Sequence, residues 1–308
     1  MDVKEKVTEY LKYLKSSGRA ERTVQGRYYD LNLFLAFLEQ EKISDIHGLT
    51  KDLVAGYQEE LAYRLTGKGM PLSIRTQAHL MSVVKGFTRY LKDQEYLLHD
   101  PCDGIQLPRK PKRLPKTILS LKEIEYLMGQ PNTRTNQGYR DRLILEILYD
   151  TAIRRNELSS IKLTDMDIDA GFIHIHGKGS KDRIVPLSKR VCELAGNYIL
   201  IVRPALVKGK DEGYLILNRW GNRMDGNSIW YLIKKYSKGL DRNVSPHTLR
   251  HTCATHMLRN GAPVRHLQEM LGHESLESTQ IYTRVTISDL KKIHSKYHPS
   301  ESLNDGIK

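Results

Sequence analysis

The stretch SPHTLRHTCATHMLRNGAPVRHLQEMLGHESLESTQIYTRV, residues Ser245–Val285, organises the C-terminal half of the chain. Its apolar residues recur at helical spacing, and Gly261 and Gly272 stand where a left-handed residue commonly ends a helix. Pro263 suits a first helical turn, and Ser275 suits a helix cap. The stretch therefore predicts short consecutive helices, which can fold together so that polar side chains far apart in sequence meet on one surface.

Four polar side chains in this stretch have the chemistry of a phosphoryl-transfer site: His247, Arg250, His273 and Tyr282. An arginine fork matches phosphate oxygens, and histidine can donate hydrogen bonds or accept a proton. A tyrosine hydroxyl, with a pKa of about 10, becomes a nucleophile when a base and cationic surroundings assist it. Any one of these residues alone is more often a packing or surface residue, so the inference depends on the set.

The order of these residues resembles the C-terminal signature of the tyrosine recombinase (phage integrase) family. In that family an HxLR box, an LGH motif and a tyrosine nucleophile follow one another, and the matching segments here are PHTLRHT, MLGHES and TQIYTRV. Upstream, YDTAIRRNELSSIKL (149–163) is similar to the family's first arginine box, and HIHGKGSKDRIVPL (174–187) is similar to its lysine-bearing β-hairpin. The spacing of the motifs resembles that of the Xer-type site-specific recombinases.

The resemblance implies a catalytic set drawn from all of these motifs. A tyrosine attacks a DNA phosphodiester and forms a 3′-phosphotyrosyl bond, while two arginines and a histidine hold the phosphate. A second histidine takes the phenol proton, and a lysine protonates the leaving 5′ oxygen. In that order, the residues are Tyr282, Arg154, Arg250, His273, His247 and Lys178, with Glu157 as the acid that supports the first arginine.

Two of these positions have neighbours of the same or a similar type. Arg155 follows Arg154, and Lys181 is the alternative to Lys178. The family pattern favours the first residue of each pair. Ala152 stands where the family usually has glycine, which is a mild departure from the pattern.

The sequence predicts no metal and no cofactor. The chain lacks the cluster of acidic residues that a two-metal nuclease requires. His247 and His251 are four residues apart and could share a helix face, but no third ligand accompanies them. By the resemblance, the phosphotyrosyl bond conserves the energy of the cleaved phosphodiester, so ATP is not needed either.

The charge of the chain favours a polyanionic partner. Subtracting 36 acidic from 49 basic residues leaves a formal charge of +13 in 308 residues, which makes double-stranded DNA the leading candidate. No apolar run is long enough to span a membrane, and the first residues are typical of an amphipathic helix rather than a signal peptide. The cysteines, Cys102, Cys192 and Cys253, have no paired spacing, which argues against a disulfide framework or a zinc site. Unpaired cysteines are typical of a reducing compartment, so a cytoplasmic location is expected.

Residues 1–107 are predicted to be helical throughout, with Thr23, Thr50 and Ser73 as caps of successive helices. By the resemblance, this four-helix, SAM-like bundle is the core-binding domain that grips DNA. Residues 108–119 are predicted to be a linker, because its prolines exclude a regular helix, and its bases can follow the phosphate backbone. The predicted DNA-contacting residues of the linker are Arg109, Lys110, Lys112, Arg113 and Lys116.

Residues 120–308 are predicted to form the catalytic domain. Ser120 opens a capping box, and an apolar helix over 139–149 leads to Arg154. The pattern then alternates as in β-strands and returns to helical spacing. The predicted strands are 166–169, 172–176 and 183–187, and the next helices are 188–207 and 228–236. With a last helix that Ser288 caps, the fold class is mainly α with a small β-sheet in the catalytic domain (α+β).

Together these features predict a site-specific DNA recombinase that acts through a Holliday junction, in chromosome dimer resolution or in mobile-element integration and excision. By the family's pattern, a homotetramer, or an assembly with a related recombinase, forms on the DNA and exchanges C-terminal helices. Docking of that helix on its own subunit is the alternative. The rival functions are a type IB topoisomerase-like relaxing enzyme and a non-catalytic DNA-binding protein. The sequence leaves open the target site and any accessory partner.

Overall fold

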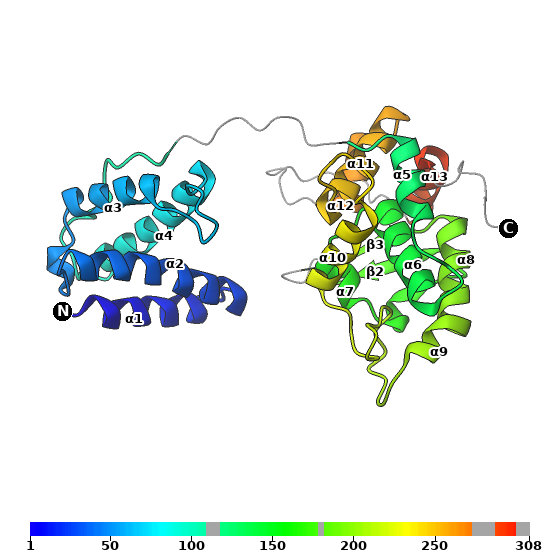
Figure 1. Cartoon of the computed structure of the whole chain (residues 1–308), viewed down its shortest axis with the longest axis horizontal. Coiled ribbons are helices and arrows are strands. Elements are labelled where there is room, and N and C mark those ends of the chain that lie inside the picture. The colour runs from blue at the N-terminus through cyan, green and yellow to red at the C-terminus, as the bar shows by residue number, and fades with distance from the viewer. Residues whose placement is uncertain (109–117, 178–181, 273–286, 300–308) are drawn as a thin grey trace. The chain divides into compact units, whose positions relative to one another are not determined.

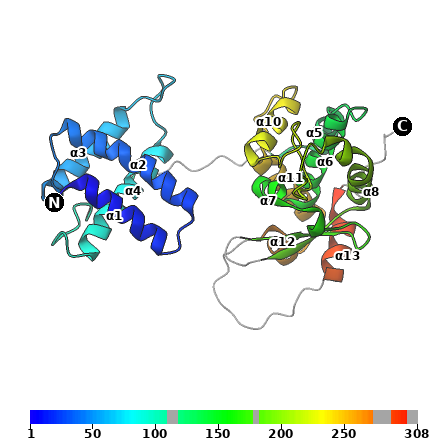
Figure 2. The same ribbon diagram turned by 90° about the horizontal axis from the view of Figure 1, so that it is seen from below.

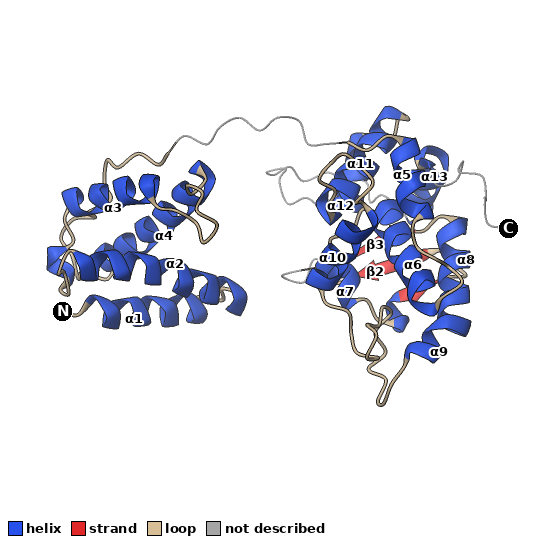
Figure 3. Ribbon diagram, viewed as in Figure 1, coloured by secondary structure: helices blue, strands red, loops and turns tan. Residues whose placement is uncertain are grey.

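The computed structural model describes residues 1–108, 118–177, 182–272 and 287–299, of which 287–291 only by their backbone. The chain divides into two compact units, Met1–Leu114 and Pro115–Lys308, which Figure 1 colours from blue to red along the sequence. Both are mainly helical, and the strands described belong to the second unit (Figure 3). This confirms the predicted fold class. Within these ranges, no helix combines the length and the apolar character that crossing a membrane requires.

Residues 1–108 form a helical bundle around one apolar core. Leu31 and Phe34 of the second helix and Phe87 of the fourth are fully buried. The ring of Phe34 meets that of Tyr57 edge-on, with 4.9 Å between the ring centroids. The elements are α1 (Val3–Ser16), α2 (Glu21–Gln40), the 3-10 helix η1 (Ile46–Gly48), α3 (Lys51–Tyr63) and α4 (Ile74–Asp93).

The helix caps of the first unit follow the sequence in two cases and differ in one. The hydroxyl of Thr50 accepts a hydrogen bond from the N–H of Leu53, and that of Ser73 accepts one from Thr76, so both predicted caps are confirmed. The prediction for Thr23 is wrong, because α2 begins at Glu21. The N–H of Thr23 already donates to the carbonyl of Ala20, so Thr23 lies inside the first turn of the helix.

The second unit is built around α6 (Asn136–Thr151), whose residues from Arg140 to Thr151 are all buried. It packs against α11 (Pro246–Arg259) and α8 (Lys189–Asn197), and it lies among helices in both views of Figures 1 and 2. A helix buried on all sides must be apolar around most of its circumference or pair its charges. The other helical elements are α5 (Leu121–Gly129), α7 (Arg155–Ser160), the 3-10 helix η2 (Leu163–Asp165), the π-helix η3 (Tyr198–Val202), α9 (Arg203–Leu206), α10 (Gly226–Tyr236), α12 (Val264–Leu271) and α13 (Ile287–Tyr297).

Several predicted helix limits of the second unit are confirmed and others shift. Ser120 forms the capping box of α5. The helical segments predicted over 188–207 are confirmed as α8, η3 and α9, which follow one another without a gap, with a π-helical stretch between the two α-helices. Ser288 is the second residue of α13 rather than its cap.

The sheet has the antiparallel strand order β1 (Met166–Asp167), β2 (Phe172–Ile175) and β3 (Arg183–Pro186) in the part of the chain that the structure describes. The predicted strands are thus present, although shorter. In the β2–β3 register, Ile173 lies opposite Val185, and Ile175 lies opposite Arg183. The register buries the isoleucines and places the start of β3 beside α12.

The turn between α6 and α7 depends on an unusual backbone conformation. Ala152 ends α6 with φ 52° and ψ 24°, which is the left-handed region, and its side chain is fully buried. An L-residue other than glycine is disfavoured there by about 1–2 kcal/mol, which explains why glycine is usual at this position in the family that the sequence resembles. The turn directs the chain so that Arg154 stands in extended conformation at the start of α7.

A pair of substitutions at Ala152 tests this conformation. Ala152→Val should lower the free energy of unfolding by about 2–4 kcal/mol, because a β-branched side chain fits neither the left-handed backbone nor the closed space. Ala152→Gly should change it by less than about 1 kcal/mol, because relief of strain offsets the greater freedom of the unfolded chain. Urea unfolding of the full chain, followed by tryptophan fluorescence, reports the second unit, since both tryptophans, at 220 and 230, lie there. Equal losses in the two variants would contradict the argument.

Candidate active site

Arg154 is fixed at the start of α7 by the first turn of that helix. Its backbone N–H donates to Glu157 Oε2 over 2.7 Å, and its Nη1 donates to Glu157 Oε1 over 2.9 Å. Its Nη2 also reaches the carbonyl of Gly272 at 3.5 Å. The side chain remains 44% exposed. Arg154 is therefore held in place and still open to a ligand.

Arg250 approaches the same turn from the other side of the site, on α11. The side chain is buried, and its Nη1 and Nη2 donate to the carbonyls of Ala152 and Leu271, each over 2.6 Å. Burial, together with the positive charge of Arg154, lowers the pKa of the Arg250 guanidinium to about 10, so it is still charged at neutral pH. The remaining N–H groups of the fork can serve another acceptor.

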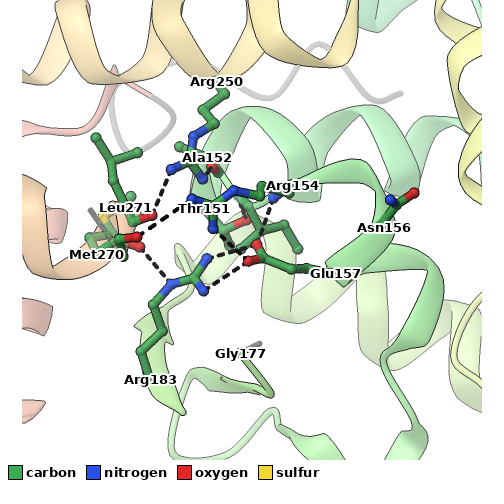
Figure 4. A network of polar contacts seen from close by, with 12 residues as sticks. Thr151, Ala152, Arg154, Asn156, Glu157, Gly177, Arg183, Arg250, Met270 and Leu271 are labelled. Atoms are coloured by element: carbon green, nitrogen blue, oxygen red, sulfur yellow. Dashed lines mark hydrogen bonds and ion pairs between the residues drawn. The ribbon is translucent and has the colours of Figure 1, made fainter. Parts of the chain in front are cut away.

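Glu157 links the first arginine to the sheet. Its carboxylate, 12% exposed, accepts two hydrogen bonds from Arg183 of β3, at 3.0 and 2.8 Å. Burial disfavours the charged carboxylate, but the hydrogen bonds from Arg183 and Arg154 outweigh it and lower the pKa of Glu157 to about 2. Figure 4 shows Arg154, Arg183 and Arg250 gathered around this carboxylate and the neighbouring carbonyls.

The last turn of α12 supplies backbone acceptors for this arginine cluster. The carbonyl of Met270 accepts from Arg183 Nε over 3.0 Å, and those of Leu271 and Gly272 accept from the other two arginines. A helix C-terminus leaves its last carbonyls without partners in the helix and carries partial negative charge, so cations stabilise it. Gly272, at φ 61°, caps α12, and the next residue in the chain is His273.

His247 lies in the first turn of α11, where its side chain is exposed. Ser245 caps that helix by accepting from the N–H of Thr248, and Pro246 occupies its first position. Because His247 and Arg250 are three residues apart on one helix, they share a face. The structure thus places His247 one turn from the buried arginine.

The structure brings together only part of the predicted set. Arg154, Glu157 and Arg250 meet in one network, with His247 nearby on α11. The side-chain Cγ of Arg155 lies near Gly226 of α10. The residues that lie outside the described parts of the chain are Lys178, Lys181, His273, Tyr282 and the linker bases Arg109, Lys110, Lys112, Arg113 and Lys116.

Arg183 is the member of the network that the sequence did not reveal. The alternating pattern assigned it to a strand, but nothing in that pattern connects it to Glu157, 26 residues earlier. A signal was nevertheless available, since Arg183 lies in the same hairpin motif as Lys178 and begins a strand whose following residues are apolar. A basic residue at the first position of a short strand can reach a helix that precedes the sheet, here α7.

A second polar cluster lies where α13 docks on α6. Asp150, His294 and His298 are buried, with 3.6 Å from Asp150 Oδ1 to His294 Nε2 and 3.5 Å from it to His298 Nδ1. These atoms are near enough to share a metal ion, but the histidine rings are stacked at an interplanar angle of 8°, so their in-plane lone pairs do not converge on one point. The geometry favours a docking contact for α13 within its own chain.

The buried carboxylate of Glu157 predicts a pH-dependent contribution to stability. Because its pKa is lowered from an ordinary 4.5 to about 2, the contribution is complete above pH 4.5 and is lost as the pH falls through 2. Glu157→Gln should therefore lower the free energy of unfolding by about 3 kcal/mol at pH 7 and by about half of that at pH 3. Urea unfolding of both proteins at several pH values measures the difference.

The matched control is Glu269→Gln, which removes a carboxylate from the exposed pair between Arg265 and Glu269 on α12, 3.7 Å apart. An exposed pair contributes about 0–1 kcal/mol, so this variant should show little change at any pH. A Glu157→Gln effect that is equally small, or that does not vary with pH, would contradict the proposed role of the carboxylate.

Comparison with known proteins finds relatives for both units of the chain. Residues 7–95 match the phage integrase N-terminal SAM-like domain, and residues 117–288 match the phage integrase family. The chain is 36% identical to a tyrosine recombinase XerD of Staphylococcus epidermidis over 296 residues, which cover 95% of this chain and 98% of that protein. It is 34% identical to a tyrosine recombinase XerC 2 of Ralstonia nicotianae, over 94% of this chain and 84% of that one.

Among solved structures, the chain is similar to the XerH site-specific recombinase in a pre-cleavage complex with its difH substrate. The TM-score is 0.66 at 21% identity, and the match covers 97% of this chain and 82% of that one. This similarity supports the fold, while the sequence matches extend over both units of the chain. The chain therefore belongs to the phage integrase family and is a site-specific tyrosine recombinase of the Xer type.

Proposed function

We propose that this recombinase cuts and rejoins double-stranded DNA through a covalent bond between Tyr282 and a 3′ phosphate. The observation that supports the proposal is the meeting of Arg154 and Arg250 at the carbonyls of Ala152, Leu271 and Gly272. Burial and the positive charge of Arg154 both lower the pKa of Arg250, so repulsion between the two guanidinium groups is part of the cost of holding them in this site. An anion between them removes this cost, and a phosphate matches two arginine forks.

In the proposed first step, the phenol oxygen of Tyr282 attacks the phosphorus of the scissile phosphodiester and the bond from phosphorus to the 5′ oxygen breaks. His247 takes the phenol proton, and Lys178 gives a proton to the departing 5′ oxygen. Arg154, Arg250 and His273 hold the non-bridging oxygens. The reverse step, with a 5′ hydroxyl of a second strand as the nucleophile, restores a phosphodiester and frees the tyrosine, so neither metal nor cofactor is required.

Preorganisation is the contribution of the described residues to this reaction. Backbone carbonyls and the Glu157 carboxylate fix Arg154 and Arg250 before DNA arrives. Charged donors that are already oriented toward a developing charge stabilise the transition state without reorganisation, and loss of one typically costs about 10²–10³ in rate.

The neighbouring arginines supply a matched test of this role. Arg154→Ala should lower the rate of DNA cleavage by about 10²–10³, because it removes one preorganised donor. Arg155→Ala should change the rate by less than about threefold, since that side chain lies against α10. Single-turnover cleavage, measured at saturating protein so that DNA binding does not limit the rate, compares the two. The reverse ranking would show that Arg155 is the catalytic arginine.

We further propose that both units bind the DNA site, with residues 1–107 as core-binding domain, 108–119 as basic linker and 120–308 as catalytic domain. The net charge of +13 supports a DNA partner. Four protomers assemble on two sites, pass through a Holliday junction and exchange their C-terminal helices. The full-length similarity to bacterial XerD and XerC proteins favours chromosome dimer resolution in the cytoplasm over mobile-element transfer.

A nicked suicide DNA carrying the recombination site tests the tyrosine chemistry. The wild-type chain should form a covalent protein–DNA adduct on a denaturing gel, and Tyr282→Phe should form none, because only the hydroxyl can attack the phosphate. Tyr231→Phe, which changes an exposed tyrosine of α10, is the control and should behave like wild type.

Paired sites distinguish a recombinase from a relaxing topoisomerase. They should yield four-way junctions with the wild-type chain, whereas a topoisomerase-like enzyme relaxes supercoils without them. An adduct from Tyr282→Phe would place the nucleophile elsewhere. Absence of any adduct from a wild-type chain that binds the site would favour a non-catalytic DNA-binding protein.

A further inference from the structure

His176 joins three segments of the catalytic domain through one exposed ring. It directly follows β2, its Nε2 lies 3.2 Å from Asp165 Oδ1 of η2, and its Nδ1 lies 3.1 Å from Asp182 Oδ2, just before β3. The N–H of Gly177 also donates to Asp182, over 3.2 Å. The imidazole therefore connects the end of β2 to Asp182, at the start of β3, and to Asp165 of η2, the element that follows α7.

This geometry selects one protonation state of His176. A carboxylate oxygen only accepts hydrogen bonds, and a neutral imidazole has a single N–H to donate. Both contacts can be hydrogen bonds only if the ring is an imidazolium with two N–H groups. The bonds to Asp165 and Asp182 accordingly raise the pKa of His176, and the bond from His176 lowers the pKa of Asp182.

The bridge completes the attachment of the hairpin to the arginine network. On one side, Arg183 opens β3 and is held by Glu157 of α7. On the other side, Ile175 and Arg183 form the last paired positions of β2 and β3, and His176 continues beyond them. The contact with Asp165 ties this second side to η2, which follows α7 in the chain. Gly177 and Asp182, the described residues on either side of 178–181, are thus both held near the region that carries Arg154.

We propose that His176, as an imidazolium bound to Asp165 and Asp182, is a positioning residue for DNA cleavage. It fixes both ends of the segment that contains Lys178 and thereby acts through that lysine. The inference rests on the proposed function, in which Lys178 protonates the leaving 5′ oxygen. A general acid contributes only when its proton lies within hydrogen-bond reach of the leaving group, so holding the ends of its segment raises the cleavage rate.

The charged groups around His176, within the described residues, come from three elements. η2 supplies Asp165, whose other oxygen accepts the N–H of Lys162 over 2.8 Å. The entry to β3 supplies Asp182 and then Arg183, whose guanidinium is engaged by Glu157. β2 supplies His174, which is near enough to influence Asp182. The carboxylates dominate this environment and favour the imidazolium.

The raised pKa gives the bridge a direction with pH. It is complete below the ordinary histidine value of 6.5 and is lost as the pH rises through the raised pKa of His176. At pH 6 the wild-type chain should cleave faster than His176→Leu. The difference should be modest, about three- to tenfold, because exposed ion pairs are weak. This ratio should be smaller at pH 9, because it falls toward about one as the pH rises through the raised pKa of the ring.

A DNA substrate with sulfur in place of the bridging 5′ oxygen tests whether His176 acts through the general acid. A thiol has a pKa of about 8.5, so sulfur leaves as a thiolate without protonation, unlike an alkoxide. With the oxygen substrate, Lys178→Ala should cleave about 10²–10⁴ more slowly than the wild-type chain, and His176→Leu should show its smaller defect. With the sulfur substrate, both variants should match the wild-type rate.

His174→Leu is the matched control, since His174 is an exposed residue two positions earlier whose ring lies against Phe172 and which acts on Asp182 through its charge rather than through a hydrogen bond. It should cleave both substrates at the wild-type rate. If sulfur restores Lys178→Ala but not His176→Leu, or if the His176→Leu defect is the same at pH 6 and pH 9, the positioning role is wrong and the general acid stands. If sulfur restores neither, the assignment of Lys178 is wrong, and the inference about His176 falls with it.

Discussion

The arginine network depends on one largely buried carboxylate that pairs with two arginines. Glu157 accepts hydrogen bonds from Arg154, in its own helix, and from Arg183, on the sheet. A buried charge is costly unless it is paired and fully hydrogen-bonded, and here both oxygens are satisfied. The pair fixes the spacing between α7 and β3, and Arg183 continues to α12 through the carbonyl of Met270. These contacts therefore fix α7, β3 and α12 relative to one another.

Backbone carbonyls at the ends of two helices also hold the arginines. Ala152 ends α6 and Gly272 ends α12, both in left-handed conformation, and the carbonyls around them receive the arginine side chains. Backbone carbonyls move less than side chains, because the helix behind them is rigid, so the guanidinium groups inherit the precision of the fold. This arrangement explains why residues far apart in sequence can form a charged site before any ligand binds.

The sequence predicted those features that local interactions determine. Thr50, Ser73 and Ser120 were recognisable as caps because a cap bonds to a residue three positions later. The prediction of Thr23 as a cap was wrong because the local sequence is also compatible with an earlier start of α2, at Glu21.

Local sequence patterns could not predict contacts between residues that are far apart in the chain. The Arg183–Glu157 pair depends on strand register and on the angle between α7 and the sheet, and the bridge from His176 to Asp165 has the same origin. Only the motif order, which carries family information, led to Arg154 and Arg250.

The docking of α13 has a consequence for how such chains associate. Asp150, in the last turn of α6, is fully buried beneath His294 and His298, so departure of the helix exposes a carboxylate and an emptied surface to water. A helix tethered to its own body competes for that surface at an effective concentration on the order of millimolar. A neighbour's helix can displace it only when the neighbour is confined at a similar local concentration. Any scaffold that raises the local concentration of this chain therefore favours exchange of the helix, and dilution favours the docking of α13 on its own chain.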